Sequence, residues 1–165
     1  MEKRKESSFL EMTGKIVIAA LLVAILLLNL FTHVMPVMRY YGTGMEPTLH
    51  DRQILFVLKT DELKEGDIAV FYYNNKVLVR RVVCEGGKQI SIDKAGNVSV
   101  NGQLLEEPYL TEKSLGQCNI EFPLNVPMGQ YFVMGDVRDE AMDSRLSEIG
   151  TISKERMIGK VLFAF

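Results

Sequence analysis

The chain has 165 residues, 47% of them hydrophobic, and its 19 basic and 21 acidic residues leave a formal net charge of −2. This length suits one ordinary globular domain and is too short for two full-sized ones. The balanced charge excludes nucleic acid as the main partner, because nucleic-acid binding requires a basic stripe. Two cysteines and two histidines without CxxC or HxxxH spacing argue against a metal site, so we expect no metal and no cofactor.

The first predicted element is an apolar segment near the N-terminus. Residues 16–35 contain 17 apolar residues out of 20 and no charged residue. A helix of about 20 residues crosses the roughly 30 Å hydrocarbon core of a bilayer, so we predict a transmembrane helix here. A cleaved secretory signal is an alternative, but no A-x-A cleavage site follows the segment. A buried core helix is a further alternative, although a helix that is apolar on every face is unusual in so small a domain.

The charges around this segment predict its orientation in the membrane. Four basic residues precede it, namely Lys3, Arg4, Lys5 and Lys15. The positive-inside rule therefore places residues 1–15 in the cytoplasm and residues 36–165 outside, in a single-pass protein of the cell membrane. The outer part contains 15 basic and 18 acidic residues, a net charge of −3, so we expect contact with lipid through the helix alone.

After Pro36 the pattern changes to short alternating or β-branched runs separated by glycine, asparagine and aspartate, which is typical of a β-rich domain. We predict strands at residues 37–42, 53–58, 67–73, 76–84, 89–92, 98–100, 131–134 and 157–165. Turn signals at 74–75, 94–97 and 101–102 predict antiparallel hairpins. The expected fold class is therefore mostly β, with one N-terminal transmembrane helix.

The two cysteines, Cys84 and Cys118, are 34 residues apart in the sequence. An oxidising compartment outside the membrane would permit a disulfide, but sequence separation does not give the distance between two side chains. A disulfide and two separate packed thiols both remain open.

Four segments of the outer part carry a family resemblance in their order and spacing. Their sequences are GTGMEPTL at 42–49, EGDIAVF at 65–71, VRRVV at 79–83 and GDVRDEAMDSR at 135–145. They resemble the G-x-S-M-x-P-T-L, G-D-x-V-x-F, K-R-V-I and G-D-N-R-x-x-S-x-D-S-R motifs of type I signal peptidases, which are membrane-anchored serine–lysine peptidases. The closing IGK at 158–160 is similar to the last strand of that family. The resemblance implies the signal-peptidase β-fold at the outer face of the membrane.

The chain departs from the family pattern at three positions that carry the family's catalysis, and Val137 also replaces the asparagine of the last motif. Gly44 stands where the family has its nucleophilic serine, Arg80 replaces the lysine base, and Ala141 replaces the serine that orients the lysine. Glycine has no nucleophile, and neutralising an arginine of pKa about 13 at pH 7 would cost roughly 8 kcal/mol. We therefore expect that no catalytic residue of the serine–lysine pair is intact.

The remaining motif residues suggest two roles. A structural ion-pair network behind the site is implied for Arg81, Asp136, Arg138, Asp143 and Arg145. Candidates for contacting an extended peptide, bound by strand addition, are Met45, Pro47, Arg80 and Val82. The fixed charge of Arg80 suits a carboxylate or carbonyl of a partner, or an internal pair with Asp143 or another acid.

The leading hypothesis is a catalytically inactive, signal-peptidase-like protein that binds exported protein segments and assists surface pilus assembly in a Gram-positive bacterium. The chain resembles the degenerate homologues found in pilus gene clusters, and this implies a pilin or other exported protein as the partner, with a sortase as a further candidate. The alternative is an active, atypical type I signal peptidase with a displaced nucleophile. Candidates for that nucleophile are Thr43, Thr48 and Ser144, with His50 as a possible base. A third hypothesis is a plain anchored interaction domain that has no peptide cleft.

Overall fold

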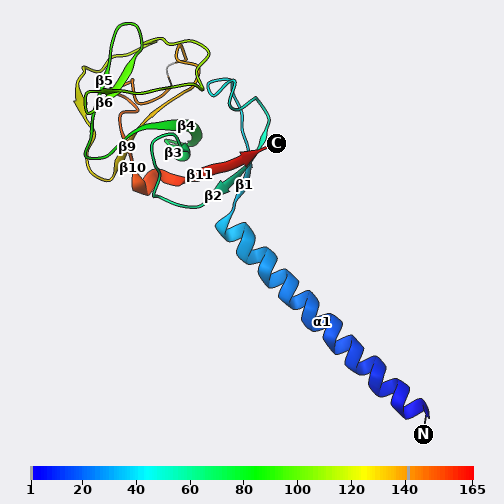
Figure 1. Cartoon of the computed structure of the whole chain (residues 1–165). Helices are drawn as coiled ribbons and strands as arrows, with labels where there is room; N and C mark the ends of the chain where they lie inside the picture. The colour runs from blue at the N-terminus through cyan, green and yellow to red at the C-terminus, as the bar shows by residue number, and fades with distance from the viewer. Residues whose placement is uncertain (1, 141) are drawn as a thin grey trace. The chain divides into compact units, whose positions relative to one another are not determined.

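The computed structural model describes residues 2–140 and 142–165, with the side chains of 2–11 and of residue 30 left aside. The chain divides after Pro36 into two compact units, which Figure 1 traces along the chain from the blue N-terminus to the red C-terminus. Each unit is described separately below.

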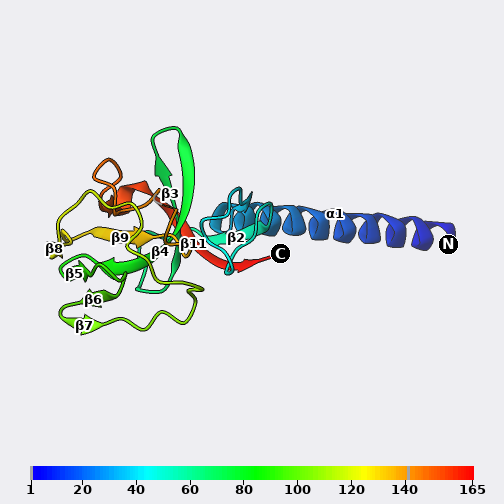
Figure 2. The same ribbon diagram turned by 90° about the horizontal axis from the view of Figure 1, so that it is seen from above.

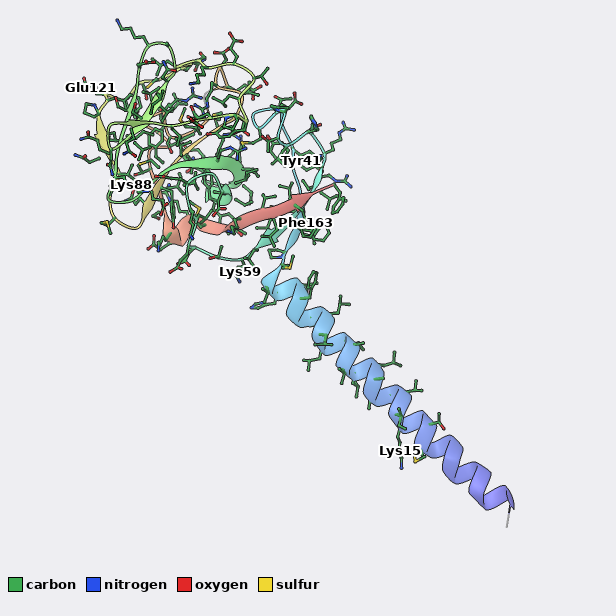
Figure 3. All side chains as sticks on the ribbon, viewed as in Figure 1. Lys15, Tyr41, Lys59, Lys88, Glu121 and Phe163 are labelled. Atoms are coloured by element: carbon green, nitrogen blue, oxygen red, sulfur yellow. The ribbon has the colours of Figure 1, made fainter. Side chains whose placement is uncertain are left out.

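The first unit is the helix α1, which spans Glu2–Val34. Its segment Met12–Val34 has 23 residues and is long and apolar enough to cross a membrane, judged by length and composition. All described side chains of that segment are exposed, and Figure 3 shows them around the whole circumference of the helix. The alternative of a buried core helix is therefore wrong. The helix also begins earlier than the span predicted at residues 16–35.

The second unit, Val37–Phe165, contains two antiparallel sheets, so the mostly β prediction is confirmed. The larger sheet has the order β1-β2-β11-β3-β4-β9-β10. Its strands are β1 (Val37–Arg39), β2 (Ile54–Leu58), β3 (Ile68–Tyr73), β4 (Lys76–Glu85), β9 (Gln130–Met134), β10 (Ile152–Ser153) and β11 (Met157–Ala164), with the short 3₁₀ helix η1 (Lys154–Arg156) before β11. The smaller sheet has the order β7-β6-β5-β8 and consists of β5 (Gln89–Ile92), β6 (Val98–Val100), β7 (Gln103–Leu104) and β8 (Leu124–Asn125).

The predicted hairpins form where the turn residues indicated them. Asn74, between β3 and β4, has a φ of 52°, and Gly96, between β5 and β6, has a φ of 83°. Figure 2 shows the β3–β4 hairpin as a long green loop and places β5 to β8 together at one end of the domain. Three strands were not predicted, β7, β8 and β10, because two residues are too short for a period-2 pattern.

Three hydrophobic clusters form the core of the β unit. One contains Phe71 and Val82, and a second contains Ile90 and Phe132. The third joins Met45, in the loop after β1, to strands β2, β3 and β4. Because Met45 is fully buried in this cluster, it holds the neighbouring residue 44 in place against the sheet.

Gly159 of β11 provides a test of this packing. A Cβ atom on Gly159 would lie 2.0 Å from the carbonyl oxygen of Leu58, a backbone atom that cannot move away cheaply. We expect Gly159→Ala to lower the free energy of unfolding by about 1–3 kcal/mol or more, measured by urea denaturation of the detergent-solubilised chain. Gly14→Ala is the matched control because a Cβ there meets nothing within 4 Å. Equal stability of the two variants would contradict the packing described here.

Candidate functional site

A cleft in the β unit brings together three stretches that are distant in sequence. It has a volume of about 610 Å³ and is lined by residues 38–44 of β1 and the loop that follows it, residues 76–80 of β4, and Glu140 from the loop after β9. In the sheet, β2, β11 and β3 lie between β1 and β4, so the cleft does not arise from neighbouring strands. Gly44 and Arg80, which the motifs align with the nucleophile and the base of the family, both line this cleft.

Gly44 lies at this cleft and is buried. Its carbonyl oxygen accepts a hydrogen bond of 3.1 Å from the backbone N–H of Val137. A Cβ atom on Gly44 would lie 3.4 Å from both Nη1 and Nη2 of Arg80 and 3.1 Å from Oε2 of Glu140. Gly44 and Arg80, which the motifs align with the family nucleophile and base, therefore lie next to each other, and a Cβ at residue 44 would be in close contact with the Arg80 and Glu140 side chains.

Arg80 is 7% exposed and is held by backbone carbonyl groups. Its Nε donates to the carbonyl oxygen of Met142 at 2.9 Å, and its Nη1 donates to that of Val79 at 2.7 Å. Within residues 2–140 and 142–165, no carboxylate forms a salt bridge with Arg80. The suggested pairing of Arg80 with Asp143 is wrong, because Asp143 binds Arg145 instead.

Glu140 and Thr43 form a hydrogen-bonded pair on the wall of the cleft. The Thr43 hydroxyl donates to Oε1 of Glu140 at 2.7 Å. Nearby, burial raises the pKa of Tyr40, and the charge of Arg80 partly opposes this shift. Glu140 was not a candidate in the sequence because no motif assigns it a role. Ala141, which follows it, lies outside the described residues.

The other hydroxyl candidates for a displaced nucleophile are used in structural hydrogen bonds. Thr48 donates to Asp136 and accepts from Nη2 of Arg81 at 3.1 Å. Ser144 is buried and accepts from the N–H of Val133 at 3.0 Å. His50 is exposed, and its Nδ1 lies 3.9 Å from a Glu46 carboxylate oxygen. The structure therefore shows no hydrogen bond between His50 and the hydroxyl of Thr48 or Ser144.

The four candidates for peptide contact differ in their burial and in whether they line the cleft. Met45 and Val82 have no exposed surface and belong to the hydrophobic core, so their assignment to peptide contact is corrected. Pro47 is exposed and follows a cis peptide bond, but it does not line the cleft. Arg80 is the candidate that lines it.

Three buried ion pairs lie behind the cleft. Nη2 of each arginine approaches a carboxylate oxygen, at 2.6 Å in Arg81–Asp136, 2.6 Å in Arg138–Glu107 and 2.8 Å in Arg145–Asp143. Each carboxylate side chain is completely buried. A buried charge is stable only when it is paired and hydrogen-bonded, so these pairs contribute to the rigidity of the scaffold.

Two members of this network are absent from the sequence motifs, Glu107 and Tyr109. The Tyr109 hydroxyl donates to Oε1 of Glu107 at 2.8 Å, and the guanidinium carbon of Arg81 lies 3.9 Å from the Tyr109 ring centroid. Burial, followed by the charge of Glu107, raises the pKa of Tyr109. These contacts connect the pairs of Arg81 and Arg138. Neither residue carries a local sequence signal, because the segment between β7 and β8, which contains both, meets the ion-pair network only in the folded chain.

The cysteines do not form a disulfide, since Cys84 and Cys118 are both free. Burial raises the pKa of the Cys84 thiol to about 11, which leaves little thiolate at neutral pH. Among the residues that the structure describes, no three histidine, cysteine, aspartate or glutamate side chains are grouped so that they could hold a metal ion.

Sequence comparisons with known proteins give matches over nearly the whole chain. A family model described as "Signal peptidase, peptidase S26" matches residues 10–165. Signal peptidase I T of Bacillus subtilis is 35% identical over 99% of this chain and 88% of its own length. Signal peptidase I of Bacillus licheniformis is 36% identical over 98% and 90%, respectively.

A similarity in three dimensions supports the same assignment. The crystal structure of a signal peptidase I from Enterococcus faecalis matches with a TM-score of 0.52 and 25% identity, covering 62% of this chain and 97% of that one. The sequence match extends over nearly the whole chain, and the fold agrees over the part that is compared. The chain therefore belongs to the signal peptidase (peptidase S26) family.

Proposed function

We propose that this chain is a membrane-anchored member of the signal peptidase family that binds an extended segment of an exported protein without cleaving it by serine–lysine chemistry. The observation that carries the proposal is the pairing of Gly44 with Arg80 at the centre of the cleft. Helix α1 anchors the chain with its N-terminus inside, and the β unit lies outside the membrane.

The chemistry at this centre supports binding rather than hydrolysis. A serine–lysine peptidase needs a hydroxyl to attack the scissile carbonyl and a neutral amine to accept its proton. Gly44 supplies no hydroxyl, and the Arg80 guanidinium remains charged at any physiological pH. The two groups that face each other here can contact a peptide but cannot perform the first step of acyl transfer.

The binding mode follows from the sheet. β1 is an edge strand of the larger sheet, and residues 38–44, which comprise its end and the following loop, line the cleft. An edge strand has unpaired backbone N–H and C=O groups, which an extended peptide can use by strand addition. The exported segment thus binds by its backbone, and the side chains of the cleft select its sequence.

The alternative function, cleavage of signal peptides, is favoured by the relatives, which are named signal peptidase I and match nearly the whole chain. One observation in the cleft also favours it, the hydrogen bond between Thr43 and Glu140. A hydroxyl and a base within hydrogen-bond distance are the minimum for an activated nucleophile. However, a carboxylate is in general a much weaker base than the neutral amine of a serine–lysine peptidase.

A narrower proposal concerns the identity of the partner. The exported segment belongs to a pilin, and the chain assists surface pilus assembly together with a sortase. This proposal is supported by the joint replacement of serine and lysine, in which the chain resembles degenerate homologues from pilus gene clusters. Deleting the gene should remove surface polymers and leave general secretion intact, and a general secretion defect would contradict it.

Incubation of the detergent-solubilised full-length chain with a preprotein tests binding against cleavage. We expect the preprotein to bind and to remain uncleaved, as measured by pull-down and by gel analysis of the products over time. Specific cleavage would establish the alternative if Thr43→Val and Glu140→Gln each abolish it. Thr111→Val is the matched control, because Thr111 is exposed and lies outside this cleft.

A further inference from the structure

We propose that the cleft selects an exported segment that carries acidic side chains, and that Arg80 binds one of these carboxylates. This inference rests on the proposed function, because it names the class of peptide that the same site binds. Three observations carry it: the charge of the cleft, the Arg80 donors that no described residue uses, and the position of both Arg80 Nη atoms beside Gly44 on the cleft lining.

The charge of the cleft is opposite to that of the domain around it. The charged residues that line the cleft are Arg39, Lys76, Arg80 and Glu140, so three positive charges and one negative charge give a net +2. Residues 36–165 as a whole carry 15 basic and 18 acidic residues, and removing those four leaves 12 basic and 17 acidic, a net −5. A positive cleft in an otherwise acidic domain attracts a negatively charged peptide.

Arg80 retains hydrogen-bond donors for a ligand. A guanidinium has five N–H donors, and two of those of Arg80 are used in bonds to Met142 and Val79. Nη2 makes no hydrogen bond to a residue in the described part of the chain. The remaining donors are on Nη1 and Nη2, which are equally distant, at 3.4 Å, from the position of a Gly44 Cβ. Both ends of the fork thus lie beside Gly44 on the lining of the cleft, where a carboxylate bound in the cleft can reach them.

Glu140 opposes such a ligand. Its Oε2 lies 3.1 Å from the same position above Gly44, so it faces the space from another direction. Glu140 would repel a ligand carboxylate bound beside it, although the exposed Glu140 side chain can turn toward solvent. A space between a guanidinium and a carboxylate would otherwise suit an uncharged amide. The two ligands make opposite predictions for Glu140→Gln, because this change strengthens the binding of an acid and weakens that of an amide donor.

Fluorescence anisotropy on the detergent-solubilised full-length chain tests the proposal. The probes are labelled, alanine-rich peptides of one length with glutamate or glutamine at matched positions, all amidated at the C-terminus. A further glutamine peptide has a free C-terminal carboxylate. We expect the glutamate peptides to bind about tenfold more tightly than the glutamine peptides, with a preference that decreases as salt is added. In Glu140→Gln this preference should increase severalfold.

The preference for glutamate should disappear in Arg80→Gln and persist in Lys59→Gln, where an exposed lysine outside the cleft is changed. Arg39→Gln with Lys76→Gln, both at exposed positions, gives a second test if Arg80→Gln does not fold. Equal binding of the two peptide types, a preference for the free C-terminus alone, or weaker glutamate binding by Glu140→Gln would each overturn the inference. Binding of neither peptide would instead contradict the proposed function.

Discussion

Replacing Gly44 with serine, Arg80 with lysine and Ala141 with serine in one chain should produce signal-peptide cleavage at a rate on the order of 100-fold or more above the parent chain. The substitutions supply a nucleophile, a base and a hydroxyl that orients the base, and a positioned general base alone contributes about 100-fold or more. The geometry permits the change, because the three atoms nearest to a Cβ at residue 44 are the ends of the flexible Arg80 and Glu140 side chains, which can shift by a few tenths of an ångström. Cleavage of a preprotein by the purified, detergent-solubilised variant is the measurement.

The partial variants separate the contributions of the three groups. Gly44→Ser alone should be inactive, because Arg80 cannot accept the proton of the new hydroxyl. Gly44→Ser with Arg80→Lys should give little activity, since no hydroxyl at residue 141 holds the lysine. Gly44→Ala in the otherwise restored chain is the matched control and should also be inactive. Full activity of Gly44→Ser by itself would refute the argument about the base.

Removing the carboxylate of Asp143 should be strongly destabilising, by about 3–5 kcal/mol, because it leaves the buried charge of Arg145 without a counter-ion. Both side chains are completely buried, and Asp143 accepts hydrogen bonds from Nε and Nη2 of Arg145 and from the N–H of Gly135. Urea denaturation of Asp143→Ala in the full-length chain, followed by circular dichroism, measures the loss.

Asp139→Ala is the matched control for this prediction, as Asp139 is an exposed acid of the same loop. Its substitution should change stability by no more than about 0.5 kcal/mol. A loss below about 1 kcal/mol in Asp143→Ala would show that the pair does not stabilise the loop.

Because a Cβ on Gly135 would lie 2.8 Å from the carbonyl oxygen of Gly44, displacement of Gly135 should also weaken peptide binding in the cleft.

The elements with strong local signals were predictable from the sequence. The long apolar run indicated a helix, and the period-2 strands with asparagine and glycine turns indicated hairpins. The strands at β5 and β6 agree with the predicted residues at both ends. Local backbone preference and side-chain periodicity act within a few residues, so they can be read without knowledge of the rest of the chain.

The candidate site was only partly predictable. The motifs indicated that residues 44 and 80 share a centre, and the structure places them on one cleft. The same motifs suggested that Met45 and Val82 contact a peptide, whereas both side chains point into the core. A motif gives the identity of a residue but not the face of the loop or strand on which its side chain lies. Exposure depends on what packs against that face.

The sequence by itself determined the chemical character of this protein. It shows an apolar segment long enough to span a membrane, a β-rich part after residue 36, and a glycine and an arginine at the positions that the motifs align with a serine and a lysine, because each is a property of residue type or local pattern. Only the tertiary structure decided the surroundings of Arg80, with carbonyl partners at Val79 and Met142 and with Gly44 and Glu140 beside it. Those groups come from segments up to about 100 residues apart, and their distances exist only once the sheet has closed around them.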